Sequence, residues 1–185
     1  DRPKTVGDTS VQDYTFKHQA AAMAVIQDAY FENCKFVGRQ DVIYGETGAT
    51  VAFEECDLYG STDYLMGPMT AVFHKCNLVI NTSDHKNDYS HLTAPQQSSG
   101  RGYIFWDCVV TATTPGVDTA STYGGKNNNT FGRPWTPNTS EAVFVNTVIE
   151  AADAQYGGGS LISAAGWDAG LGGKSAGMQE YGTVE

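Results

Sequence analysis

The sequence predicts an all-β protein built as a single-stranded parallel β-helix, with about 20–22 residues in each coil and with loop insertions between some coils. Three observations predict this fold. A frame of the form Φ-x-Phe-x-x-Cys-x-Φ, in which Φ is apolar, recurs along the chain. Each copy alternates apolar and polar residues and is followed by turn residues, which is typical of strands. The chain also contains 21 Gly and only 6 Pro, which suits a turn-rich β-protein.

The repeated frame defines the order of the coils. Its phenylalanines are Phe31, Phe53, Phe73, Phe105 and Phe144, and its cysteines are Cys34, Cys56, Cys76 and Cys108, with Thr147 at the fifth cysteine position. The phenylalanines are separated by steps of 22, 20, 32 and 39 residues, so a basic coil is enlarged twice by insertions. Because all four cysteines occupy one position of the frame, we expect a row of buried thiols, not a disulfide framework or a metal site.

Other segments fit around this frame. The segment HQAAAMAV (residues 18–25) lies one period before the first frame, which favours a strand over a helix. The two insertions are polar and rich in turn residues; one contains HLTAP (91–95) as a possible short strand, and the other contains FGRPW (131–135). A polar tail, MQEYGT, follows near the C-terminus. Loops on one side of a solenoid commonly form its binding face.

Composition excludes several classes of partner. The 185 residues are 41% apolar, which suits one domain over 1–185 with a sizeable core. A net charge of −10 argues against binding to nucleic acid or to an anionic membrane surface. No apolar run is long enough to span a bilayer, and the N-terminus lacks the pattern of a secretion signal.

The 22-residue step suggests a functional column. Asp41 and Asp63 are 22 residues apart, and the same count back from Asp41 reaches Gln19. Two carboxylates one strand spacing apart in a partly desolvated groove cannot both ionise cheaply, so one becomes a nucleophile and the other an acid. The alternative is that both aspartates end strands and cap turns, as Asp often does.

Five segments resemble the pectin methylesterase (pectinesterase) family. HQAAAMAV is similar to that family's Gln-Ala-Val-Ala-Leu, GRQDVIYG to Gly-Tyr-Gln-Asp-Thr-Leu-Tyr, and GSTDYLMG to Gly-Thr-Val-Asp-Phe-Ile-Phe-Gly. FGRPW is similar to Leu-Gly-Arg-Pro-Trp, and SAAGW to Pro-Ala-Gly-Trp. The segments occur in the family's order, from about residue 18 onward. The resemblance implies a right-handed parallel β-helix and hydrolysis of the methyl esters of homogalacturonan to pectate and methanol.

The resemblance also implies catalytic roles. Asp63 matches the nucleophile, and Asp41 matches the acid/base that protonates the departing methanol and then activates water. Gln40 and Gln19 match the amides that stabilise the oxyanion. Arg133 matches the guanidinium that holds the nucleophilic carboxylate.

Substrate contacts follow from the same resemblance. Trp135 and Trp167 match aromatics that contact the sugar, and Tyr44 and Met66 match groove-lining positions, with packing as the alternative for all four. The implied partner is methyl-esterified homogalacturonan (pectin), and no cofactor or metal is expected. This substrate implies a secreted or cell-surface protein, which we expect to be a monomer.

One departure concerns length. Roughly the first third of a typical family member has no counterpart, so we expect a chain that lacks its N-terminal coils and that needs them for full activity. Two other functions stay open: a β-helical polygalacturonase, and a non-catalytic pectin-binding β-helix fragment. A calcium-dependent lyase fits least, because the run DHKND (84–88) lacks the spacing of a known calcium loop.

Overall fold

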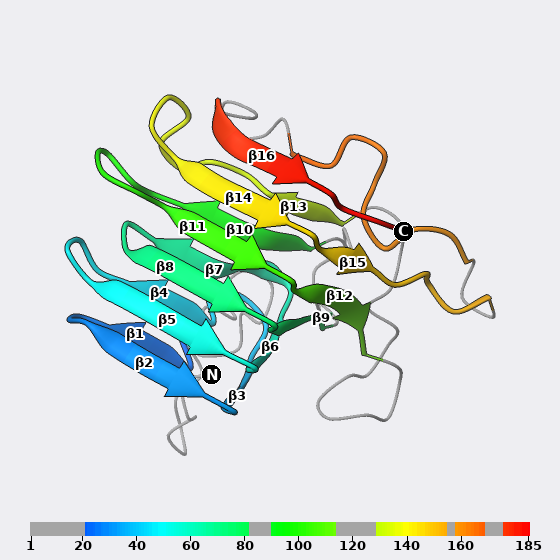
Figure 1. The fold of residues 1–185 in the computed structure, drawn as a ribbon, viewed down its shortest axis with the longest axis horizontal. Coiled ribbons are helices and arrows are strands. Elements are labelled where there is room, and N and C mark those ends of the chain that lie inside the picture. Colours follow the sequence, from blue (N-terminus) through cyan, green and yellow to red (C-terminus); the bar gives the residue numbers. More distant parts are fainter. Residues whose placement is uncertain (1–20, 82–89, 114–128, 155–157, 169–175) are drawn as a thin grey trace, which may run out of the picture.

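The computed structural model describes residues 21–81, 90–113, 129–154, 158–168 and 176–185. Within them the chain winds through three parallel sheets, with one strand of each sheet in most coils, so that neighbouring strands are three elements apart in sequence, except β14 and β16. Figure 1 shows the coils stacked from β1 and β2 at one end to β16 at the other. This arrangement is a parallel β-helix, as the repeated frame predicts.

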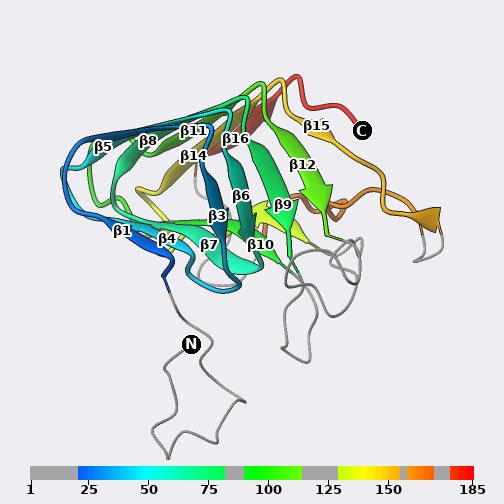
Figure 2. The same cartoon turned by 90° about the horizontal axis from the view of Figure 1, so that it is seen from below.

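The three sheets are named here in chain order. The first sheet contains β1 (Met23–Val25), β4 (Ile43–Gly45), β7 (Thr62–Gly67), β10 (His91–Pro95) and β13 (Thr130–Gly132). The second sheet contains β2 (Ala29–Glu32), β5 (Thr50–Glu54), β8 (Thr70–His74), β11 (Tyr103–Trp106), β14 (Glu141–Val145) and β16 (Gly177–Tyr181). The third sheet contains β3 (Lys35–Val37), β6 (Asp57–Gly60), β9 (Asn77–Ile80), β12 (Val109–Ala112) and β15 (Val148–Ile149). Viewed from below in Figure 2, the sheets surround a common interior.

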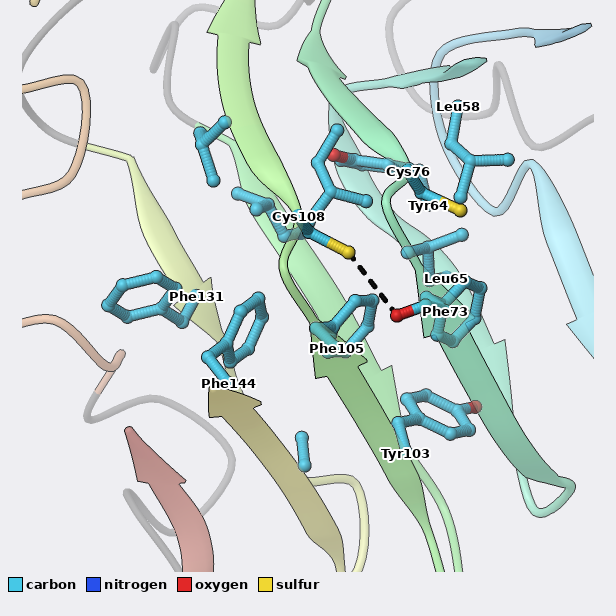
Figure 3. Close-up of a cluster of buried hydrophobic side chains, with 14 of the residues drawn as sticks. Leu58, Tyr64, Leu65, Phe73, Cys76, Tyr103, Phe105, Cys108, Phe131 and Phe144 are labelled. Carbon is cyan, nitrogen blue, oxygen red and sulfur yellow. Dashed lines mark hydrogen bonds between the residues drawn. The ribbon is translucent and has the colours of Figure 1, made fainter. Parts of the chain in front are cut away.

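The frame phenylalanines form one continuous stack. In the second sheet Phe31, Phe53, Phe73, Phe105 and Phe144 are in register from coil to coil. Neighbouring ring centroids lie 4.3–5.2 Å apart, with the rings close to parallel. Figure 3 shows the C-terminal part of this stack, Phe73, Phe105 and Phe144, within the core. Since burying one Phe side chain contributes roughly 1.5–3 kcal/mol, the stack is a large part of what holds the coils together.

The frame cysteines form a second row, as expected. All four are free thiols, and three of them are fully buried. Each buried Sγ lies within hydrogen-bonding distance of the frame phenylalanine's carbonyl one coil earlier, as for Cys108 Sγ and Phe73 O at 3.3 Å (Figure 3). Thr147 continues the row and is also buried.

The turn between the second and third sheets needs one left-handed residue in each coil. The residue before every frame cysteine, and before Thr147, has a φ of 50–53° and is exposed; these residues are Asn33, Glu55, Lys75, Asp107 and Asn146. Each donates its backbone N–H to a carbonyl of the next coil, at 2.8–3.0 Å. Glu and Lys have no preference for this conformation, so the stacking of coils imposes it.

Expected strands and observed strands differ at the two ends. HLTAP is confirmed as β10, and within 18–25 the described part contains β1. The tail containing MQEYGT is not a plain tail: β16 adds a sixth strand to the second sheet and buries Met178. The first coil is also shorter than the 22-residue count assumed, because Met23 pairs with Ile43. The run DHKND lies outside the described residues.

In the described part of the chain, no helix has the length and apolar character needed to cross a membrane.

Candidate active site

Asp41 and Asp63 lie in adjacent coils where the chain passes from the third sheet into the first: Asp41 just before β4 and Asp63 at the start of β7. Pairing at Val37↔Tyr59 before them and at Ile43↔Leu65 after them preserves the 22-residue offset. The Asp41 N–H donates to Thr62 O at 3.1 Å, across the same boundary. The column predicted from the sequence therefore contains both aspartates.

Both aspartates have a left-handed backbone, with φ of 54° at Asp41 and 51° at Asp63. Asp tolerates this region better than most residues, although it still costs free energy that the surrounding structure must offset. Asp63 also lies in a β-bulge: β10 pairs with β7 at His91↔Thr62 and then at Thr93↔Leu65, so that Asp63 and Tyr64 together oppose one residue. Bulges change the direction of a side chain and are common near active sites.

Arg133 holds the Asp63 carboxylate through two hydrogen bonds. Its Nε donates to Oδ1 at 2.9 Å and its Nη2 donates to Oδ2 at 2.6 Å. The Asp63 side chain is only 2% exposed, whereas that of Arg133 is 21% exposed. A buried carboxylate in such a bidentate pair is held in a fixed orientation.

The lack of a side chain at Gly132 lets β13, which precedes Arg133, lie close to β10. The φ of Gly132 is 153°, and a Cβ at this position would lie 2.1 Å from Thr93 Oγ1 and 2.4 Å from Thr93 O. A larger residue would therefore push β13 away from β10. The Arg133 N–H then donates to Thr93 O at 3.0 Å, which fixes the start of the side chain.

The pKa of Asp41 is raised. Burial, reinforced by the negative charge of Asp63 and opposed by Arg133, raises the pKa of Asp41 from 3.8 to about 6. Near pH 6 Asp41 can thus hold a proton, one coil away from the carboxyl group that Arg133 holds. A carboxylate and a carboxylic acid on adjacent coils can act as nucleophile and general acid.

The predicted amide donors are only partly described. Gln40 is half-buried and directly precedes Asp41, so its backbone lies in the column. Gln19 lies outside the described residues. In the described first coil, the pairing of Met23 with Ile43 gives a step of 20 residues, so the count of 22 back from Asp41 does not continue through β1.

The predicted groove residues lie side by side. Tyr44 pairs with Met66 across β4 and β7, three residues after each aspartate, and both are half-buried. Met66 in turn pairs with Ala94 of β10. Both side chains are therefore partly exposed, and each follows one of the two aspartates closely in sequence.

Trp135 is 47% exposed and is presented by an anchored loop. Its N–H donates to Pro95 O at 3.0 Å, and the Ser140 hydroxyl donates to the same carbonyl at 2.6 Å. The Thr136 hydroxyl donates to Gln97 O at 2.8 Å. An exposed indole on a loop held at several points is suited to contact a sugar ring.

Trp167 differs from Trp135. It is 6% exposed, and its ring lies 5.6 Å from that of Phe131 and 6.0 Å from that of Phe144. Most of the indole therefore packs in the core, which is the alternative considered for it. Contact of Trp167 with a ligand stays a prediction.

Sequence reasoning did not identify His91 and Asp168 as part of this region. His91 is 1% exposed, its Nε2 lies 3.0 Å from Asp168 Oδ2, and the charges of Arg133 and Asp63 both act on it. Placing HLTAP one coil after Asp63 would have put His91 opposite Thr62. The second signal, Asp168 directly after SAAGW, has no regular spacing to either residue.

Among the described residues, no group of three or more His, Cys, Asp or Glu side chains is arranged to hold a metal ion.

Comparisons with known proteins agree with this fold and identify a family. The family model described as Pectinesterase matches residues 11–171. Pectinesterase 2 of Citrus sinensis is 30% identical over 157 residues, covering 81% of this chain and 27% of that protein. Among solved structures, the pectin methylesterase of Yersinia enterocolitica is 26% identical with a TM-score of 0.63, covering 89% of this chain and 55% of that one. The Aspergillus niger pectin methylesterase shares the fold at 22% identity and a TM-score of 0.70, covering 93% and 51%.

The chain thus spans about a quarter of the length of the curated relatives and about half of the solved structures. The family match nevertheless covers most of its residues, and it includes both aspartates, Arg133 and Trp135. By this match, the chain belongs to the pectinesterase family.

Proposed function

We propose that this chain carries the catalytic site of a pectin methylesterase, which hydrolyses the methyl esters of homogalacturonan to pectate and methanol. Membership of the pectinesterase family supports the class of reaction. One structural neighbour is a pectin methylesterase in complex with a hexasaccharide, which supports an oligosaccharide as the ligand. The observation that carries the proposal is the buried Asp63 carboxylate, gripped by Arg133, with Asp41 of raised pKa one coil away.

In the first half of the reaction, an Asp63 oxygen attacks the carbonyl carbon of the methyl ester. The carbonyl electron pair moves onto oxygen, and the amides of Gln40 and Gln19 donate hydrogen bonds to this oxyanion. When the carbonyl re-forms, the bond to the methoxy oxygen breaks and Asp41 gives that oxygen its proton. Methanol leaves, and the galacturonate carbonyl is joined to Asp63 as an anhydride.

In the second half, water attacks the same carbonyl while the Asp41 carboxylate takes one of its protons. The bond to Asp63 breaks, the free carboxylate of pectate is released, and both aspartates return to their starting states. The net reaction consumes one ester and one water and gives one acid and one methanol. Named side chains handle each proton and electron pair, so we propose a reaction that needs no metal ion or cofactor.

Substrate binding would involve the exposed residues beside the column. Trp135 would stack on a sugar ring, and Tyr44 and Met66 would line the neighbouring subsites. We propose a secreted or cell-surface monomer, in keeping with a cell-wall polymer as substrate. Because the chain spans only part of its relatives, further coils of the same kind are expected to contribute to full activity.

The test is methanol release from highly esterified pectin, with EDTA present, by the parent and by Asp63→Asn. We expect release by the parent and a loss of roughly 10³-fold or more in the variant, because the nucleophile is removed. Asp107→Asn is the matched control, since Asp107 has the same left-handed backbone but lies in the other turn. It should leave the rate unchanged.

Other outcomes would favour the alternatives. Reducing ends in place of methanol would indicate a polygalacturonase. A folded parent that binds pectin, retains this binding after Asp63→Asn and releases no methanol would indicate a non-catalytic pectin-binding β-helix.

A further inference from the structure

His91 lies beside the bulge that contains Asp63. It begins β10, where it pairs with Thr62 of β7 on one side and with Thr130 of β13 on the other. The imidazole is 1% exposed. A buried histidine at this position has to find its hydrogen-bond partners within the protein, next to the two charges that define the site.

The imidazole connects two other segments of the chain. Its Nδ1 lies 2.8 Å from Thr130 Oγ1, and its Nε2 lies 3.0 Å from Asp168 Oδ2. The N–H of Asp168 donates to Gly132 O at 3.1 Å, and Gly132 directly precedes Arg133. The imidazole and Asp168 thus hold both β13 and the segment that packs beside it.

Burial and the neighbouring charged groups shift the pKa of the His91 imidazole. Burial, reinforced by the positive charge of Arg133, lowers the pKa of His91, while Asp63 and Asp168 oppose this shift. A neutral imidazole has one donor and one acceptor. Nε2 faces the Asp168 carboxylate at 3.0 Å, and the tautomer with its proton on Nε2 leaves Nδ1 free to accept from the Thr130 hydroxyl; a neutral ring also adds no second positive charge beside the Asp63 carboxylate.

The geometry points to His91 as a positioning residue for the reaction proposed above, on which this inference rests: by bridging Thr130 and Asp168 it fixes the Gly132–Arg133 segment, and so the guanidinium that orients Asp63. His91 bonds Thr130 and faces Asp168, and both contacts lead to the segment that carries Arg133. Its effect is transmitted through Arg133, whose Nε donates to Asp63 Oδ1.

The test compares His91→Leu, which removes the Thr130 hydrogen bond and the polar contact with Asp168, with His91→Gln, whose amide can still face the Asp168 carboxylate. For His91→Leu we expect kcat to fall roughly tenfold to hundredfold, as for other displaced catalytic groups, with KM within about twofold. His91→Gln should recover part of this loss. Hydrogen exchange at Arg133 Nε, followed by NMR, should be at least about tenfold faster in His91→Leu, because its bond to Asp63 is loosened.

His74→Leu is the matched control. His74 also pairs with a carboxylate, since its Nδ1 lies 2.8 Å from Glu54 Oε2, but it lies on the second sheet. Its replacement should change neither kcat nor Arg133 exchange. If His91→Leu does not fold, Asp168→Ala removes the same bridge from a partly exposed position and replaces it in the comparison.

If the parent releases methanol, His91→Leu must lower kcat and must also speed hydrogen exchange at Arg133 Nε. If either quantity stays at the parent value, the inference is overturned. Where the folded parent releases none, the proposed function fails by itself. The exchange rate then decides alone whether His91 positions Arg133, so the two failures are distinguishable.

Discussion

Two rows of left-handed residues run along this solenoid, one at each of two turns of the coil. The turn before the third sheet contains five such residues, and the passage into the first sheet contains Asp41, just before β4, and Asp63, at the start of β7. The φ angles span 50–54° in both rows, so the backbone requirement is the same. The side chains differ: those of the five-residue row are exposed, whereas Asp63 is buried and ion-paired.

The five-residue row shows that this conformation does not select its residue. Lys75 and Glu55 occupy it, although neither prefers a positive φ, and the hydrogen bonds between coils hold them there. The identity of Asp41 and Asp63 therefore needs another cause. The pairing with Arg133 and the raised pKa of Asp41 supply one, because both depend on a carboxylate in place.

The two rows should differ most in their effect on the free energy of unfolding when the guanidinium of Arg133 is removed. Arg133→Leu leaves the buried Asp63 carboxylate without its partner, so we expect a loss of roughly 3–5 kcal/mol in the free energy of unfolding, together with loss of methanol release. Arg101→Leu is the control: Arg101 Nη1 pairs with Glu141 at 3.2 Å, but the arginine side chain is 83% exposed. Its loss should be below about 1 kcal/mol.

Urea unfolding at pH 7 measures both variants. Equal losses in the free energy of unfolding would show that the Asp63–Arg133 pair contributes no more than a surface ion pair. The two rows would then differ only in where their side chains lie. An active Arg133→Leu would mean that Asp63 does not need this partner for orientation.

A smaller effect should come from the carboxyl of Asp41, and it should depend on pH. The pKa is raised from 3.8 to about 6 in the folded state, so the folded protein keeps its proton where the unfolded chain has lost it. Stability therefore falls as pH rises from about 4 to about 6 and stays reduced above that. Asp41→Asn cannot ionise, so we expect it to be more stable than the parent at pH 7 by roughly 1–3 kcal/mol, and equal to it at pH 3.

Asp107→Asn, in the exposed row, is the control for replacing an aspartate with asparagine at a left-handed position. The comparison needs only urea midpoints of the parent and the two variants at pH 3, 5 and 7. A gain for Asp41→Asn that is as large at pH 3 as at pH 7 would show that the amide improves packing, and that the ionisation of Asp41 is not involved.

The sequence was sufficient for features that repeat. The Phe and Cys rows and the Asp41–Asp63 column follow from one frame and one step, because each coil must place the same residue types on its neighbour. Where the frame lapses, prediction fails. β16 has no frame phenylalanine, since Phe144 pairs with Glu180. The step from Met23 to Ile43 is 20 residues, two fewer than the 22 that the frame predicts.

The positions around the column depend on contacts that no period encodes. His91 and Asp168 meet because an insertion returns β10 to the bulge and because the Trp167 segment packs beside Gly132. Trp167 illustrates the same point: its motif predicts a ligand contact, yet Phe131 and Phe144 cover most of its ring. Such contacts are settled by packing between coils that are distant in sequence.

The smallest effect should come from relieving the backbone in the exposed row. A left-handed residue with a Cβ costs about 1–2 kcal/mol, and Asn offsets part of this by local hydrogen bonding. We therefore expect Lys75→Asn to raise the free energy of unfolding by about 0.5 kcal/mol, measured from the urea midpoint at constant m. Lys35→Asn, in strand β3, should instead lower it slightly, because Asn is disfavoured in strands.

Opposite signs for these two substitutions would show that the left-handed turn retains strain that a better residue can release. Equal losses would show that the hydrogen bonds between coils already determine the turn completely, so that residue type is irrelevant there. In that case the left-handed backbone at Asp41 and Asp63 would also be a consequence of the solenoid. Their carboxylates, the Arg133 pair and the raised pKa of Asp41 would then be the only features of the second row that function has to explain.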